Sequence, residues 1–188
     1  MPLVFVTGIA GSGKSTVCEE LKARGHEAYD SDRGGFSDWF DKETGEKLDR
    51  NVTPVSKAPE FQARYQWKIL SARVEELVPA ATDRFVFVCG SGSNQNEIRG
   101  LFNKVIALVV DEETLRQRII HRTTNNFGKT ESEFNEILAW HKTTAATYKE
   151  FGYTIIDSTQ PLAQVVDQVL SIAKRDYKPH TPSSPGMK

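Results

Sequence analysis

Apolar residues fall into short runs of β-forming residues, separated by segments with helical periodicity. The runs predict five strands, at residues 3–6, 26–30, 85–89, 105–110 and 153–157. The third and fourth runs are almost continuously apolar, which is typical of strands covered on both faces. Because helical patterns lie between the strands, as in repeated βαβ units, the sequence predicts an α/β fold with a parallel sheet between two layers of helices.

One helix is expected to begin at Pro59, because proline is favoured in the first turn of a helix. Phe61, Tyr65 and Ile69 follow at fourfold spacing, which predicts an apolar helical face. We therefore expect this helix to include all three residues.

Further local signals mark the later helices and the extent of the domain. Thr130 and Glu133 have the spacing of a capping box, and Pro161 precedes a segment with an apolar helical face. A chain of 188 residues suits one domain, which we place at residues 1–175. Residues 176–188 are rich in Pro, Ser and Gly, so we expect a flexible tail there.

Charge and cysteine content narrow the functional classes. The 24 basic and 25 acidic residues give a net charge of -1, which creates no general attraction to nucleic acid or anionic membranes. Cys18 and Cys89 lack the spacing of a disulfide framework or a zinc site. No targeting segment or long apolar stretch is present. We expect a cytoplasmic protein that binds neither nucleic acid nor membranes.

Candidate chemistry begins directly after the first predicted strand, where residues 8–15 read GIAGSGKS. The pattern G-x-x-x-x-G-K-S between a strand and a helix is typical of a loop whose backbone amides hold nucleotide phosphates. Lys14 would reach the β- and γ-phosphates and Ser15 would ligate Mg²⁺. The segment predicts binding of ATP with Mg²⁺ through Gly8, Gly11, Ser12, Gly13, Lys14, Ser15 and Thr16.

Residues 4–16 resemble the opening of the adenylate-kinase-like group of nucleoside, nucleotide and small-metabolite kinases. The resemblance continues with Arg118 and Arg122 after the fourth strand and with a polar, lid-like stretch at 123–130. It implies a P-loop kinase fold with strand order 2-3-1-4-5. Arg118 would stack on adenine, and Arg122 would neutralise charge on the transferred phosphoryl group. The two arginines are four residues apart, so we expect them on one helical face, although such a face is often merely solvated.

The resemblance also covers the last predicted strand and the residues that follow it. In these kinases a short segment after the last strand lies near adenine, and here that segment contains Thr159 and Gln160. Both are therefore expected to contact the nucleotide.

Acidic residues at the end of the second strand suggest an acceptor site. Asp30-Ser31-Asp32 resembles the Asp-x-Asp of shikimate kinases at the same place. Ligands of parallel sheets bind beyond the carboxyl ends of the strands. Asp30 would hold a metal-bound water, and Asp32 would accept the proton of an attacking hydroxyl. The alternative is that each carboxylate only caps a turn.

The third strand ends in Gly90 and Gly92, where many P-loop proteins have a metal-binding aspartate. Metal binding would then rest on Ser15, phosphate oxygens, water and Asp30. The glycines permit a ligand to approach the backbone, or they form a turn before a helix capped by Ser93.

A long insertion at residues 31–58 is the expected acceptor-binding segment. Its aromatic residues and Trp67, expected on the next helix, would form a stacking wall, while Arg33 or Arg64 would hold an anionic group. The aromatic residues are alternatively part of the core. Shikimate kinases have an arginine directly after the phenylalanine of this helix, whereas this chain has Gln62 after Phe61, which argues against shikimate as the acceptor.

The leading hypothesis is transfer of the ATP γ-phosphoryl group to a hydroxyl of a small polar metabolite or nucleoside, with Lys14, Asp32 and Arg122 as catalytic residues. One alternative is a nucleoside monophosphate kinase, in which Arg33 and Arg64 bind the acceptor phosphate and no base is needed. Another is a non-catalytic ATP-binding regulator. The acceptor and the oligomeric state are left open.

Overall fold

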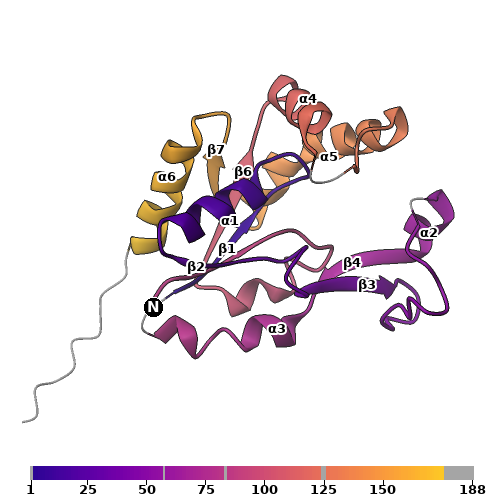
Figure 1. The fold of residues 1–188 in the computed structure, drawn as a ribbon, viewed down its shortest axis with the longest axis horizontal. Helices are drawn as coiled ribbons and strands as arrows, with labels where there is room; N and C mark the ends of the chain where they lie inside the picture. The colour runs from indigo at the N-terminus through magenta and orange to yellow at the C-terminus, as the bar shows by residue number, and fades with distance from the viewer. Residues whose placement is uncertain (1, 57, 83, 124–125, 176–188) are drawn as a thin grey trace, which may run out of the picture.

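The computed structural model describes residues 2–56, 58–82, 84–123 and 126–175. At its centre is a parallel sheet of five strands, in the order β2-β5-β1-β6-β7. The strands are β1 (Leu3–Thr7), β2 (Glu27–Asp30), β5 (Val86–Cys89), β6 (Lys104–Val109) and β7 (Thr154–Asp157). Taken as the five strands of this sheet in chain order, the arrangement is 2-3-1-4-5 (Figure 1). The predicted sheet and its order are confirmed.

Helices cover both faces of the sheet because alternate residues of each strand point to opposite sides. On one face Val4 and Val6 of β1 pack with apolar residues of α1 (Lys14–Ala23) and α6 (Leu162–Lys174). On the other face Leu3 and Phe5 pack in a cluster with Val74. That side includes α3 (Ser71–Glu75), the 3-10 turns Ala80–Thr82 and Ile98–Leu101, and the end of α5 (Glu131–Glu150). The result is the expected three-layer arrangement.

A two-stranded antiparallel arm extends from this core (Figure 1). It consists of β3 (Ser37–Asp41) and β4 (Tyr65–Ile69), preceded by the short helix α2 (Pro59–Arg64). The prediction of one helix through Phe61, Tyr65 and Ile69 was therefore wrong after Arg64. A spacing of four residues suits a helix, but it is also two repeats of a strand, and pairing with β3 decides between them.

The helix signals near residue 130 and residue 161 were correct. Thr130 and Glu133 form the complete capping box of α5, and α6 begins directly after Pro161. However, α4 (Glu112–His121) ends one residue before Arg122, whose backbone is extended. The expectation that Arg122 lies on this helix was therefore wrong. The expected tail at 176–188 lies outside the described residues, and no described helix is long and apolar enough to cross a membrane.

Candidate functional site

The glycine loop connects β1 to α1 and is shaped by its backbone. Gly11 and Gly13 have φ angles of 85° and 98°, which residues with a side chain rarely adopt. A side chain at Gly8 would stand 2.6 Å from the carbonyl oxygen of Leu108, so the loop lies directly against β6. This conformation carries the loop into α1, whose N-cap is Gly13, where helix amide groups favour anions.

Lys14 is folded back over this loop. Its Nζ donates hydrogen bonds to the carbonyl oxygens of Gly8 and Ile9, at 2.8 Å and 2.9 Å, and the residue is only 8% exposed. Burial lowers the pKa of Lys14; Asp32 and Asp30 oppose the shift, while Arg122 adds to it. The charges of Asp32, Asp30 and Arg122, which were predicted as catalytic or metal-binding residues, therefore all influence the pKa of the buried Lys14 ammonium group.

Arg118 joins the glycine loop to the segment after β7. Its guanidinium donates to the carbonyl oxygen of Ser12 at 3.2 Å and to that of Ser158 at 2.6 Å. The Ser158 hydroxyl also donates to the Ser12 carbonyl, at 2.6 Å. Burial lowers the pKa of Arg118. The arginine thus fixes the loop against the expected adenine side, and its stacking on adenine stays a prediction. Sequence reasoning did not assign Ser158, since a serine after a strand gives no distinctive signal.

Arg122 donates to the carbonyl oxygen of Phe127, and its Nε is buried with no hydrogen-bond partner among the described residues. Burial lowers the pKa of Arg122, and Glu133 opposes this shift. Glu133 in turn accepts from the amide of Gly128 at 3.0 Å. The described part of the lid-like stretch is therefore attached to α5, while residues 124 and 125 lie outside the described residues.

Asp30 and Asp32 follow β2 in a tight turn. Asp30 Oδ1 accepts from the amide of Asp32 at 3.0 Å, so the turn-capping interpretation holds for Asp30. Asp32 is exposed, and its Oδ1 accepts from the indole Nε1 of Trp67 at 3.1 Å. Trp67 lies on β4, not on the predicted helix. The arm therefore contacts the carboxylate predicted to be the base, a pairing that joins residues 35 positions apart and gives no local sequence signal.

Gly90 and Gly92 serve packing between segments of the chain. A Cβ at Gly90 would stand 1.6 Å from the Ser31 hydroxyl, and one at Gly92 would stand 3.0 Å from the Ile69 amide nitrogen. The Gly90 amide already donates to Val6 at 3.0 Å. The two glycines thus allow other segments of the chain to pack closely against the backbone, and the structure gives no sign that an acceptor does so.

The segment after these glycines also holds the arm. The Asn94 side chain accepts from the Ile69 amide and donates to the Ile69 carbonyl, each at 2.9 Å. Ser93 bonds Gln66 at 2.9 Å and caps no helix, so the alternative of a helix starting there was wrong.

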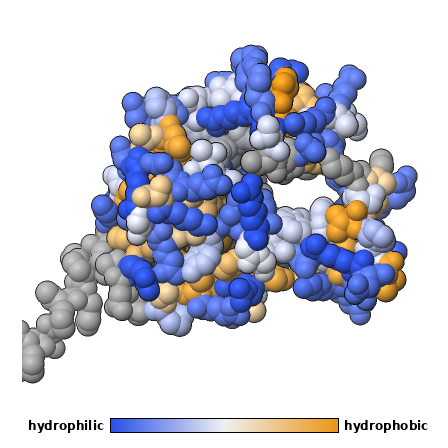
Figure 2. Space-filling view, viewed as in Figure 1, coloured by the Kyte–Doolittle hydropathy of each residue, from blue (hydrophilic) through white to orange (hydrophobic). Residues whose placement is uncertain are grey.

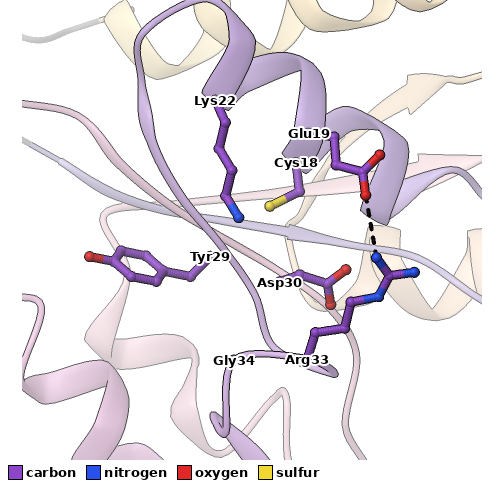
Figure 3. A pocket seen from close by; sticks show the side chains of 7 residues that line it. All are labelled: Cys18, Glu19, Lys22, Tyr29, Asp30, Arg33 and Gly34. Carbon is purple, nitrogen blue, oxygen red and sulfur yellow. Dashed lines mark hydrogen bonds and ion pairs between the residues drawn. The ribbon is translucent and has the colours of Figure 1, made fainter.

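Arg33 and Arg64, both predicted to bind the acceptor, form ion pairs with carboxylates of this chain. Arg64 Nε lies 2.7 Å from Asp41 Oδ2 on the arm. Arg33 Nη1 lies 3.4 Å from Glu19 Oε1 of α1. Figure 3 shows this pair at the edge of a pocket of about 230 Å³ lined by Cys18, Glu19, Lys22, Tyr29, Asp30, Arg33 and Gly34. The two arginines therefore contact different surfaces rather than one shared anion site.

Thr159 and Gln160 follow β7, as predicted for the adenine side. The amide and hydroxyl of Thr159 donate to Asp157 Oδ1 at 2.9 Å and 2.8 Å. Gln160 accepts from Gln168 Nε2 at 2.7 Å. The segment is thus held in a defined conformation, and its contact with the nucleotide stays a prediction.

The predicted metal ligands suit a Mg²⁺ ion that is bound to the nucleotide, rather than a metal ion held by protein groups alone. No group of three His, Cys, Asp or Glu residues in the described part of the chain could hold a metal ion. Mg²⁺ on a nucleotide needs only one or two protein oxygens, because phosphates and waters supply the remaining ligands. Ser15, partly exposed in the first turn of α1, and Asp30, at the end of β2, are the two protein oxygen donors predicted for such an ion, and their contact with Mg²⁺ stays a prediction.

Comparison with known proteins now identifies the family. The model of an AAA domain family matches residues 4–139. The chain belongs to this AAA domain family. Its matched region includes the glycine loop, the arm and both arginines of the site. No curated protein matches the sequence.

Three solved structures with similar folds are described as kinases. A shikimate kinase from Acinetobacter baumannii, in complex with shikimate, has a TM-score of 0.59 at 18% identity over 95% of this chain and 96% of that one. A sugar kinase from Janibacter sp. HTCC2649 has a TM-score of 0.53 at 18% identity over 89% and 91%. A gluconokinase from Sinorhizobium meliloti 1021 is also similar, at 18% identity over 92% and 91%, with a TM-score of 0.47. At such identities, the AAA-domain protein shares with the first two its P-loop kinase fold.

Proposed function

We propose that this AAA-domain protein is a phosphotransferase that moves the γ-phosphoryl group of ATP to a hydroxyl of a small acceptor. The observation that carries the proposal is the position of Lys14, which is buried at the glycine loop and donates from Nζ to the carbonyl oxygens of Gly8 and Ile9. This buried ammonium at a phosphate-binding loop is acted on by two carboxylates and a half-buried arginine. That arrangement supports charge neutralisation together with a candidate proton acceptor, which phosphoryl transfer to an alcohol requires.

Each group has a defined task in this reaction. The amides of the glycine loop and Lys14 hold the β- and γ-phosphates, and Arg122 neutralises charge on the transferred group. Mg²⁺, held by Ser15 and through water by Asp30, would shield the phosphate oxygens. The acceptor oxygen attacks the γ-phosphorus, the bond to the β–γ bridging oxygen breaks, and Asp32 takes the hydroxyl proton.

Three further residues are proposed to contact the nucleotide on its adenine side. Arg118, Thr159 and Gln160 lie near the junction of the loop and the segment after β7, where the adenine would bind. A cytoplasmic location is proposed because the sequence has only two cysteines, Cys18 and Cys89, without the density or spacing of a disulfide framework.

The test measures ADP formation with pooled small-molecule acceptors, together with calorimetric ATP binding. Replacing Asp32 by Asn should lower turnover by about 100-fold or more, because a general base contributes that much, while ATP affinity is unchanged. Asp167→Asn is the control, since this exposed carboxylate pairs with Arg24 on α1 and should not affect turnover. Near-normal turnover of Asp32→Asn would remove Asp32 from the base role. ATP binding without ADP formation in any pool would favour the non-catalytic regulator instead.

A further inference from the structure

One face of the arm carries aromatic side chains. Cross-strand pairs join Ser37 to Ile69, Trp39 to Trp67 and Asp41 to Tyr65. Because side chains alternate along strands and directly opposed residues share a face, these six residues lie together. Lys68, the one basic residue in the two strands, belongs to the opposite face. The face that contacts Asp32 through Trp67 therefore has three aromatic side chains, and its charges are Asp41 and the Arg64 that pairs with Asp41 and lies over the Tyr65 ring.

The two tryptophans form a supported platform. The Trp39 and Trp67 rings are 5.4 Å apart with an interplanar angle of 59°, and Phe61 packs edge-on against Trp39 at 5.1 Å. Both tryptophans are partly exposed. Figure 2 shows a notch between this arm and the part of the molecule that carries α4 and α5. Aromatic faces of this kind bind planar rings and the apolar faces of sugar rings.

The contact between Trp67 and Asp32 leaves half of the carboxylate available. Asp32 Oδ1 accepts from Trp67 Nε1 at 3.1 Å and from the Ser31 hydroxyl at 3.5 Å. Among the described residues no hydrogen bond to Asp32 Oδ2 is formed. Oδ2 is therefore available to accept from a further donor beside the Trp67 ring, while Trp67 holds Oδ1.

Two arginines near this face are paired with carboxylates of the protein. Arg64 pairs with Asp41 at 2.7 Å, and Arg33 pairs with Glu19 at 3.4 Å. On the opposite face, Arg50 pairs with Asp38 at 2.8 Å. An acidic or phosphorylated acceptor would compete with Asp41 or Glu19 for these arginines, whereas an uncharged acceptor leaves both ion pairs intact.

We propose that the phosphoryl acceptor is an uncharged, ring-containing compound with several hydroxyl groups, which binds against Trp67 and Trp39 and donates one hydroxyl to Asp32. This chemistry is shared by free sugars and nucleosides and excludes hydroxy acids, sugar phosphates and nucleotides. The inference rests on the proposed function and selects among its acceptors.

The first experiment compares acceptor classes by ADP release. Four pools are used: neutral sugars, nucleosides, hydroxy and sugar acids, and phosphorylated compounds. Stimulation by the sugar pool or the nucleoside pool is expected, and which one responds identifies the source of the ring. Strongest stimulation by either anionic pool would overturn the substrate assignment while leaving the kinase proposal intact. If no pool stimulated ADP release, the kinase proposal would fail, and the assignment with it.

The second experiment uses variants of the arm with the active acceptor. Trp67→Ala should raise the acceptor KM by about 10-fold with unchanged ATP affinity, because it removes a stacking surface. Trp67→Phe keeps a ring but loses the indole N–H, so it should lower kcat more than it raises KM. Lys68→Met, one residue away on the opposite face, should change neither constant. Circular dichroism confirms that each variant is folded. An unchanged KM in Trp67→Ala, or an effect of Lys68→Met as large as that of Trp67→Phe, would contradict the proposal.

Discussion

The closest packing in the candidate site lies between Gly90 and Ser31, and it makes a quantitative prediction. A Cβ at residue 90 would stand 1.6 Å from Ser31 Oγ and 2.6 Å from Ser31 Cβ. Rotating the serine side chain can remove the first overlap but not the second. Ser31 is 1% exposed, and its amide donates to the Cys89 carbonyl at 2.8 Å, so its backbone cannot move away freely. The change Gly90→Ala therefore forces β2 and β5 apart beside Asp32.

Overpacking of this kind costs about 1–3 kcal/mol of folding free energy. In a chain of this length, 2 kcal/mol corresponds to a fall in melting temperature of about 4–8 °C. Thermal and urea unfolding measure the loss, and ADP formation should fall as well, because the turn that carries Asp32 is displaced. The same substitution at Gly100 is the control, since nothing lies within 4 Å of a Cβ there. Gly100→Ala should leave stability unchanged or slightly raised.

A compensating change separates the overlap from other effects. The double variant Gly90→Ala with Ser31→Gly removes both overlapping atoms while keeping the amide that bonds Cys89. It should recover most of the lost stability, apart from roughly 0.5–1 kcal/mol for the added flexibility of glycine. The reasoning is refuted if Gly90→Ala melts within about 1 °C of the wild type. It is also refuted if the double variant is no more stable than Gly90→Ala.

Three further predictions concern stability. Thr130→Ala removes the cap of α5 and should cost about 1 kcal/mol in urea unfolding. Thr147→Ala, at a partly exposed position within the same helix, should cost less, and equal losses would contradict a capping role. Burial lowers the pKa of His26 in the folded protein, so the unfolded chain binds a proton first as pH falls. Wild type should then lose more unfolding free energy between about pH 7 and pH 5 than His26→Gln, and parallel pH profiles would exclude this effect. Gly128→Ala should lower the melting temperature more than Gly45→Ala does. Both glycines have a positive φ, but only a Cβ at residue 128 would meet a neighbouring side chain, that of Ile137 at 2.6 Å. Similar melting temperatures would show that the contact with Ile137 relaxes.

Much of the fold could be predicted because its signals are local. The three inner strands of the central sheet, β5, β1 and β6, are short and mainly apolar runs, and burial on both faces of a parallel sheet requires such runs. The glycine loop is equally local, since its backbone angles and its lysine are fixed by adjacent residues. The capping box of Thr130 and Glu133 is confirmed for the same reason, because it spans only three positions.

The arm could not be predicted from spacing alone. Residues 65–69 alternate in a way that suits a strand, yet Phe61, Tyr65 and Ile69 also fit a helix. Only pairing with Ser37–Asp41, more than 20 residues earlier, selects the strand. Strand stability depends on such distant partners, whereas helix bonds are made within the segment.

For this protein, the sequence by itself determined the five-stranded parallel sheet, the phosphate-binding loop and the residue types available for phosphoryl transfer. The tertiary structure decided which of these side chains are paired with other residues of the chain. It paired Arg33 and Arg64 with Glu19 and Asp41, and it brought Trp67 to Asp32. Ion pairs and cross-strand contacts depend on distances of a few ångströms between distant segments, and these distances are fixed only when the chain folds.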